Sequence, residues 1–257
     1  MIIIKSPREI ALIKEASRVV AVVLDEMRAY IKPGVSTAFL DQKVREITAR
    51  EGATPAELGY YGYPGAVCAS VNECILHGIP SEKKVLRDGD IITLDFVARK
   101  NGYCGDAART YPVGIVTERA KRMVSIAEES FYNAVSLVKP GVHVGDISHA
   151  IEETARKHGC SVPREFTGHG IGREMHEDPM IPCYGNPGQG PLLREGMTIC
   201  IEPMILEGKP GVRILKDGWT VLAKDGGLTS HYENTVLVTK DGYEILTKLD
   251  DRKEEGF

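Results

Sequence analysis

The sequence predicts an α+β fold built from two similar halves, in which helices cover a curved, mainly antiparallel sheet. Three observations lead to this prediction. Two stretches of the chain recur at one fixed distance, each half begins with amphipathic helical segments, and each half continues into segments rich in strand-forming residues. The fold class therefore follows from a duplicated helix-then-strand pattern.

The internal repeat organises the chain. The tetrapeptide KPGV at Lys32–Val35 returns at Lys139–Val142, 107 residues later. The segment Leu86–Asp95 returns at the same distance as Leu193–Glu202. Single short matches arise by chance, but two matches at one offset in similar contexts indicate a duplication. The halves should be related by a pseudo-twofold axis.

A third match refines the boundaries of the repeat. The tripeptide at His77–Ile79 returns as His169–Ile171 at a shorter offset, so the second half carries an insertion at about Pro179–Leu193. This insertion is rich in Pro and Gly and is predicted to be a loop. The whole chain, 1–257, is expected to be one catalytic domain with repeat halves at about 6–114 and 115–246.

Helix signals mark the start of each half. Ser6 and Glu9 form a capping box with Pro at the first helical position, and apolar residues follow at helical spacing. Thr117 precedes a comparable helix in the second half. A second helix is expected after each KPGV, ended by Gly52 in one half and by Gly159 in the other.

Strands are predicted after these helices, at 90–98, 103–113, 197–202 and 232–239. Asn101 and Gly102 separate the first two, and this dipeptide is the strongest short-range signal for a two-residue hairpin turn. In such a hairpin Val97 lies opposite Asp106, which places Asp95 and Asp106 on the same face as diagonal neighbours.

Asp95 is unusual because it interrupts an apolar strand. A buried carboxylate costs several kcal/mol unless it is paired, protonated or bound to a metal. An ion pair with Arg109 is the simpler explanation. However, a second acid at Asp106 on the same face would repel Asp95, and a divalent cation between the two removes that repulsion.

The second half adds further ligand candidates. Glu202, the repeat counterpart of Asp95, also ends an apolar strand, and Glu233 begins another. His169 lies between glycines, where a ligand can approach the backbone closely. Several carboxylates with one histidine suit a pair of divalent ions with mixed oxygen and nitrogen ligands, as in two-metal aminopeptidases.

Composition excludes several other functions. The net charge of −4 provides no basic surface for nucleic acid. The longest apolar run, 19–24, is far too short to cross a bilayer, and the N-terminus does not read as a signal peptide. Six scattered cysteines without a C-x-x-C pair indicate reduced thiols. A cytoplasmic protein is expected.

These residues and their neighbours resemble the methionine aminopeptidases. The local strings NGYCGD, GHGIGR, IEP and HYENT carry the resemblance, which extends from about Ser6 to Leu246. It implies the pita-bread fold and two divalent ions, drawn from Co, Mn, Fe, Ni and Zn. With no long insertion between His169 and Glu202 and no N-terminal zinc-finger extension, the chain is similar to the short bacterial type I form.

The resemblance also assigns metal ligands. Asp95 would chelate one ion and His169 the other, with Asp106 and Glu233 bridging both. Glu202 would complete the second site and act as general base. Asn72 and Thr229 resemble positions that hold a structural monovalent cation in the family.

Substrate contacts come from the same resemblance. His176 would stabilise charge on the scissile peptide, and His77 would contact the substrate near its new N-terminus. Tyr60, Tyr63, Cys68 and Trp219 match positions that line the methionine pocket, although packing in the core would explain each of these almost as well. Met175 is a departure, because well-known bacterial relatives carry an aromatic residue there.

The implied reaction is hydrolytic removal of the N-terminal methionine from nascent polypeptides, with a small second residue preferred. The implied protein is a monomer that works near the ribosome and binds neither nucleic acid nor a membrane. A peptidase specific for Xaa-Pro bonds is the main alternative, since it shares the ligand set. A metal-free peptide-binding module is a second alternative, but such a module would lack some of the ligands.

Overall fold

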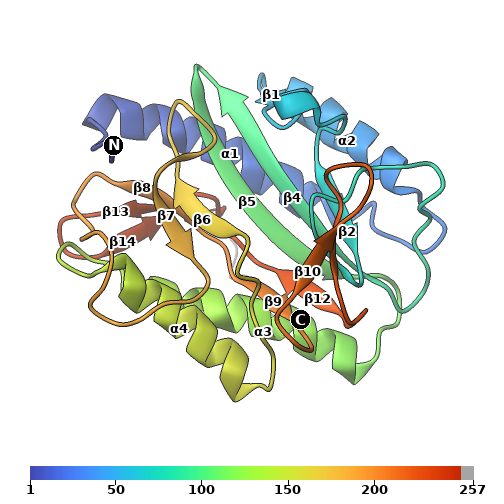
Figure 1. The fold of residues 1–257 in the computed structure, drawn as a ribbon. Helices are drawn as coiled ribbons and strands as arrows, with labels where there is room; N and C mark the ends of the chain where they lie inside the picture. Colours follow the sequence, from blue (N-terminus) through green and yellow to red (C-terminus); the bar gives the residue numbers. More distant parts are fainter. Residues whose placement is uncertain (250–257) are drawn as a thin grey trace.

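A computed structural model describes residues 1–249 of the chain. Within this range there are four α-helices and a short 3₁₀ turn at Tyr60–Gly62. The helices are α1 Pro7–Met27, α2 Thr37–Arg50, α3 Glu118–Val135 and α4 Val144–Lys157. Figure 1 shows α1 and α2 on one side of the central strands and α3 and α4 on the other. None of the helices in 1–249 is both long enough and apolar enough to cross a membrane.

The strands form antiparallel ladders in four groups. The first group has the order β1-β4-β2 with β5 paired to β4, and the largest has the order β14-β13-β8-β6-β7. Two smaller ladders are β10-β11-β3 and β12-β9. The strands are β1 Thr54–Pro55, β2 Cys68–Val71, β3 Cys74–Leu76, β4 Ile91–Lys100, β5 Tyr103–Pro112, β6 Thr167–Gly170, β7 Glu177–Pro182, β8 Thr198–Ile201, β9 Met204–Leu206, β10 Val212–Ile214, β11 Val221–Ala223, β12 Thr229–His231, β13 Asn234–Val238 and β14 Tyr243–Ile245.

The sequence repeat is also a structural repeat. The Gly34 N–H donates to the Leu86 carbonyl at 2.8 Å, and the counterpart Gly141 N–H donates to Leu193 at 2.9 Å. Both glycines adopt positive φ, 88° and 89°, a conformation that disfavours any side chain. The KPGV segment therefore recurs because it forms the same glycine-dependent turn against the same downstream segment in each half.

The predicted helix starts are confirmed. The Ser6 N–H donates to the Glu9 carboxylate at 2.9 Å, while the Ser6 hydroxyl accepts from the Glu9 N–H, which completes the capping box. Thr117 caps α3 by accepting from the Ala120 N–H at 3.2 Å. The second helices, α2 and α4, both end just before a glycine with positive φ, Gly52 or Gly159.

The hairpin of β4 and β5 has the predicted register. Asn101 and Gly102 have φ of 50° and 81°, as a type I′ turn requires. Val97 pairs with Asp106 and Asp95 with Ala108, so the two acids share one face of the sheet. This long hairpin crosses the middle of the molecule (Figure 1).

The predicted loop at Pro179–Leu193 starts too early. Pro179 and Pro182 lie inside β7, and only the residues after Pro182 form the loop. Proline is tolerated there because β7 is the edge strand of its sheet, where a missing N–H breaks no internal ladder. The short strands β1, β2, β3, β6, β9, β10, β11, β12 and β14 had no counterpart among the predicted elements.

The hydrophobic core joins the two halves. Its largest cluster combines residues of α3, α4 and β8 with Ile75, Leu76 and Ile91 from the first half. A second cluster lies between α1, α2 and the β2, β4 and β5 strands. Residues of both halves thus share one apolar cluster. The single catalytic domain stays a prediction.

A buried ion pair ties the start of the chain to β7. The Lys5 ammonium lies 2.6 Å from a Glu177 carboxylate oxygen, and the two side chains are 3% and 7% exposed. The Lys5 N–H also donates to the Gly196 carbonyl at 2.9 Å. Glu177 directly follows His176, so this pair holds the end of the segment that carries that histidine.

We predict that Lys5→Met destabilises the protein by about 3–5 kcal/mol, because it leaves the buried Glu177 carboxylate without its cationic partner. The matched control is Lys14→Met, which removes the exposed pair with Glu244 at 2.7 Å and should cost less than about 1 kcal/mol. Urea denaturation of both variants measures the difference. Equal losses would show that the Lys5–Glu177 pair contributes no more than a surface contact.

Candidate active site

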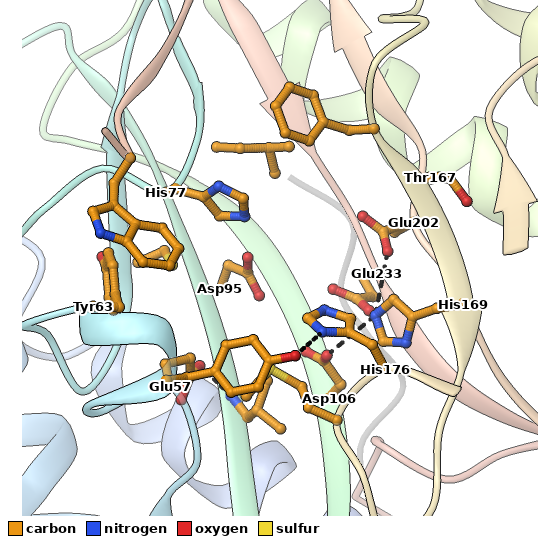
Figure 2. Close-up of a pocket in the computed structure, with 17 residues that line it drawn as sticks. Glu57, Tyr63, His77, Asp95, Asp106, Thr167, His169, His176, Glu202 and Glu233 are labelled. Atoms are coloured by element: carbon orange, nitrogen blue, oxygen red, sulfur yellow. Dashed lines mark hydrogen bonds and ion pairs between the residues drawn. The ribbon is translucent and has the colours of Figure 1, made fainter. Parts of the chain in front are cut away.

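The five predicted metal ligands converge on one cavity (Figure 2). Asp95 and Asp106 come from β4 and β5, and His169 from β6. Glu202 directly follows β8 and Glu233 directly precedes β13. Because β6 and β13 both pair with β8, backbone hydrogen bonding sets the spacing of the last three.

The acids surround the imidazole of His169. Its Nε2 lies 3.7 Å from Asp106 Oδ2 and 3.6 Å from Glu202 Oε1. Its Nδ1–H donates to the Gly170 carbonyl at 2.9 Å, which leaves the lone pair of Nε2 directed at the carboxylates. This orientation is typical of a histidine that ligates a metal through Nε2.

Burial makes this arrangement costly without a cation. Asp106, Glu202 and Glu233 are at most 8% exposed. Loss of hydration, and then repulsion from neighbouring carboxylates, raises the pKa of each of these three carboxyls well above its usual range. Burial likewise raises the pKa of Asp95 to about 7.

Unpartnered oxygens show that the residues fit divalent cations. Among residues 1–249, Asp106 Oδ1 and Glu233 Oε1 are buried and have no hydrogen-bond partner. Such atoms are rare in native proteins, and a bound cation satisfies them. Ligand atoms of Asp106, His169, Cys200 and Glu233 also lie within 4.8 Å of one another. Carboxylates with one imidazole form a suitable donor set for ions such as Mn, Fe, Co or Zn.

The ion pair between Asp95 and Arg109 is not the explanation for the buried acid. Arg109 pairs with Leu94 across the hairpin, so its side chain lies on the face opposite to Asp95. Its guanidinium donates to the Glu233 carbonyl and, at 2.7 Å, to Asn234 Oδ1. Arg109 therefore supports the segment that carries Glu233.

The two predicted substrate histidines face the same cavity. His176 lies against His169, with ring centroids 4.4 Å apart, and its Nδ1 is 2.9 Å from the Tyr60 hydroxyl. His77 is in edge contact with Trp219 and Phe166. Burial lowers the pKa of His77 to about 4 and also lowers that of His176, so both imidazoles are neutral near pH 7.

The predicted pocket residues also line this cavity. Its volume is about 180 Å³. Tyr63 and Trp219 are in edge contact at 5.1 Å. A cavity of about 150 Å³ with apolar walls holds a benzene molecule, so this one has room for a single medium-sized apolar side chain. The lining includes Tyr60, Tyr63, Cys68 and Trp219, together with Met175.

Other residues at the site were not predicted. Glu57, Leu76, Phe166 and Thr167 line the cavity, and His231 lies behind Glu202 and Glu233. Cys200 could have been found, because it lies two residues before Glu202 on the same strand face. Glu57 lies in an irregular segment and gave no periodic signal.

Asn72 and Thr229, the residues predicted to hold a monovalent cation, lie in contact. The Thr229 N–H and hydroxyl both donate to the Asn72 carbonyl, at 2.9 and 2.7 Å. This contact joins the two halves. A cation at this point stays a prediction.

The comparison with known proteins agrees with this geometry. The model of metallopeptidase family M24 matches residues 11–240. Together with the fold and the cluster of carboxylates and histidine, this match shows that the chain belongs to metallopeptidase family M24.

Within that family, the chain is similar to methionine aminopeptidases over nearly its full length. Methionine aminopeptidase 1 of Bacillus subtilis is 46% identical over 97% of this chain and 100% of its own length. The crystal structure of methionine aminopeptidase from Thermotoga maritima has a TM-score of 0.95 at 47% identity, covering 97% of this chain and all of that one. Prolidase from Pyrococcus furiosus is more distant, with a TM-score of 0.78 at 26% identity over 96% of this chain and 66% of its own.

We predict that Asp106→Asn abolishes metal-dependent stabilisation without unfolding the protein. In wild type, Mn²⁺ at 100 times its Kd should raise the free energy of unfolding by about 2.7 kcal/mol. In the variant this increase should be largely lost, whereas the metal-free Tm should be unchanged or higher, because one repelling charge is gone. Scanning calorimetry with and without Mn²⁺ measures both effects.

The control is Glu118→Gln, which changes a carboxylate that is 88% exposed on the surface of α3. It should keep the full response to Mn²⁺. A normal Mn²⁺ response in Asp106→Asn would remove Asp106 from the ligand set.

Proposed function

We propose that this protein is a metal-dependent aminopeptidase that hydrolytically removes the N-terminal methionine from polypeptides whose second residue is small. The observation that carries the proposal is the position of the buried carboxylate and imidazole cluster at the wall of a cavity sized for one apolar side chain. The names of the relatives point to the same activity.

The proposed cofactor is a pair of divalent ions. Asp95 would hold one ion and His169 the other, while Asp106 and Glu233 would bridge them and Glu202 would complete the second site. Such ions supply Lewis-acid polarisation of a carbonyl and acidification of a water molecule. Which of Co, Mn, Fe, Ni or Zn is used depends largely on availability, because this type of donor set binds all of them.

Glu202 is the proposed general base. Its Oε1 lies 3.6 Å from His169 Nε2 at the wall of the cavity, within reach of a molecule bound there.

The histidines would act on the peptide. The Tyr60 hydroxyl can donate to His176 Nδ1, which leaves Nε2–H free to donate to the oxygen that gains charge in the transition state. His77 would contact the substrate near its new N-terminus. Tyr60, Tyr63, Cys68 and Trp219 would enclose the methionine side chain, with Met175 in place of an aromatic wall.

The biological setting remains a set of proposals. The substrates would be N-termini of nascent polypeptides, met in the cytoplasm and near the ribosome, and the enzyme would be a monomer. All six cysteines are free thiols, which supports a reducing compartment. Sedimentation analysis of the purified protein tests the monomeric state, and co-sedimentation with ribosomes tests the contact with the ribosome.

We predict rapid cleavage of Met-Ala-Ser and slow cleavage of Met-Phe-Ser and Ala-Pro-Ser after metal reconstitution. A small second residue fits beside the metal ligands, whereas a phenylalanine collides with the cavity walls. Release of the first amino acid is the measurement. Preferred cleavage of Ala-Pro-Ser would favour the Xaa-Pro alternative, and binding without cleavage would favour the peptide-binding module. Full activity in metal-free protein would contradict the metal-dependent mechanism.

We predict that His176→Ala lowers kcat about 10²–10³-fold, as loss of one donor to an oxyanion does. KM should change much less, because the contact strengthens mainly in the transition state. Bound metal and Tm, measured on the same preparation, should stay close to wild type. Lost metal would make His176 a ligand, whereas a large fall in Tm with an intact kcat would make it a structural residue.

A further inference from the structure

His231 is a buried histidine behind the carboxylate cluster. It ends β12, and only 1% of its surface is exposed. Its backbone is held firmly, because its N–H donates to the Thr110 hydroxyl at 2.9 Å and its carbonyl accepts from that hydroxyl at 2.9 Å. The strand ladder pairs it with Met204. The position of its side chain is therefore fixed by two elements that also flank the site.

The imidazole of His231 faces two of the proposed metal ligands. Its Nε2 lies 3.8 Å from Glu202 Oε2 and 3.8 Å from Glu233 Oε2. Glu202 is thus flanked by His169 near Oε1 and by His231 near Oε2. Within residues 1–249, neither ring nitrogen of His231 has a hydrogen-bond partner.

An imidazole buried in this way needs a partner. Every protonation state of the ring carries at least one N–H, and a buried donor without an acceptor costs about 1–3 kcal/mol. Ionised carboxylates only accept hydrogen bonds, so the two glutamates are matched acceptors for Nε2–H. A separation of 3.8 Å is too long for a hydrogen bond, and a movement of ~1 Å by either carboxylate would close it.

We propose that His231 is a positioning residue, whose single Nε2–H is shared between Oε2 of Glu202 and Oε2 of Glu233 and directs the other oxygen of each carboxylate at the divalent ions. The role rests on the proposed metal site. His231 does not belong to the lining of the cavity within the described part of the chain, so it acts through the glutamates. His231 would thus fix the orientation of the two carboxylates, just as the Gly170 carbonyl fixes the orientation of the His169 ring.

The test compares two replacements of similar size. His231→Leu removes the donor, and we expect it to weaken Mn²⁺ binding about 10–100-fold, the usual effect of losing a residue that orients a metal ligand. His231→Gln retains an N–H donor and should bind Mn²⁺ within a few-fold of wild type. Competition with a fluorescent chelator measures the affinity independently of catalysis. Turnover of Met-Ala-Ser should follow the same order.

The matched control is Ser230→Ala on the same strand. Ser230 is fully buried, and its hydroxyl donates to the Met123 carbonyl at 2.6 Å, on the face opposite to His231. This variant should lower the Tm and leave Mn²⁺ affinity unchanged, which separates loss of packing from loss of ligand orientation. If His231→Leu does not fold, His231→Met gives a second donor-free variant with a more adaptable side chain.

Three outcomes would overturn the proposal. Wild-type affinity in the folded donor-free variant would show that the glutamates need no support from His231. If His231→Leu and His231→Gln weaken Mn²⁺ binding equally, the lone pair of a ring nitrogen matters and the proposed role of His231 as a hydrogen-bond donor is wrong. Weaker binding in Ser230→Ala, equal to that in His231→Leu, would show a general packing effect. If wild type itself binds no Mn²⁺, the proposed metal site fails, and this result is distinct from the others.

Discussion

The repulsion among buried carboxylates is the constraint on which the rest of this structure depends. Asp106, Glu202 and Glu233 are almost completely removed from water, and Asp95 lies at the same cavity. Each charge raises the cost of ionising the others, so the group is stable as carboxylates only with cations between them. A fold that assembles such a group must hold the acidic side chains rigidly, because freely moving carboxylates would repel one another and move apart.

The rigidity comes from paired strands. A two-residue turn at Asn101 and Gly102 fixes the register that brings Asp95 and Asp106 to one face. In the second half, β8 pairs with both β6 and β13, so His169, Glu202 and Glu233 have positions set by one hydrogen-bonded ladder. Arg109 and His231 lie behind this ladder. Arg109 donates to the backbone carbonyl of Glu233, and His231 lies beside the carboxylate of Glu202.

The segment that carries His176 lies outside the paired strands, between β6 and β7. The buried Lys5–Glu177 pair fixes the far end of that segment. The start of the chain thus supports a residue proposed to act on the substrate. The turns at Gly34 and Gly141 set the same chain path in each half, and residues of both halves line the cavity.

Much of this could be predicted from the sequence, because repeats, caps and turns are local signals. The offset shared by the KPGV segments, the capping box at Ser6 and the Asn-Gly turn each depend on neighbours in the chain, and each was confirmed. Asp95 became a candidate because an acid inside an apolar strand is visible without a structure, and the resemblance to the methionine aminopeptidases implied the full set of five ligands. Only the tertiary structure decided what lies behind and around them. His231, Glu57 and the Lys5–Glu177 pair join segments that are distant in sequence, and no periodicity records the packing that buries them. The edge position of β7, which admits Pro179, is likewise a property of the assembled sheet.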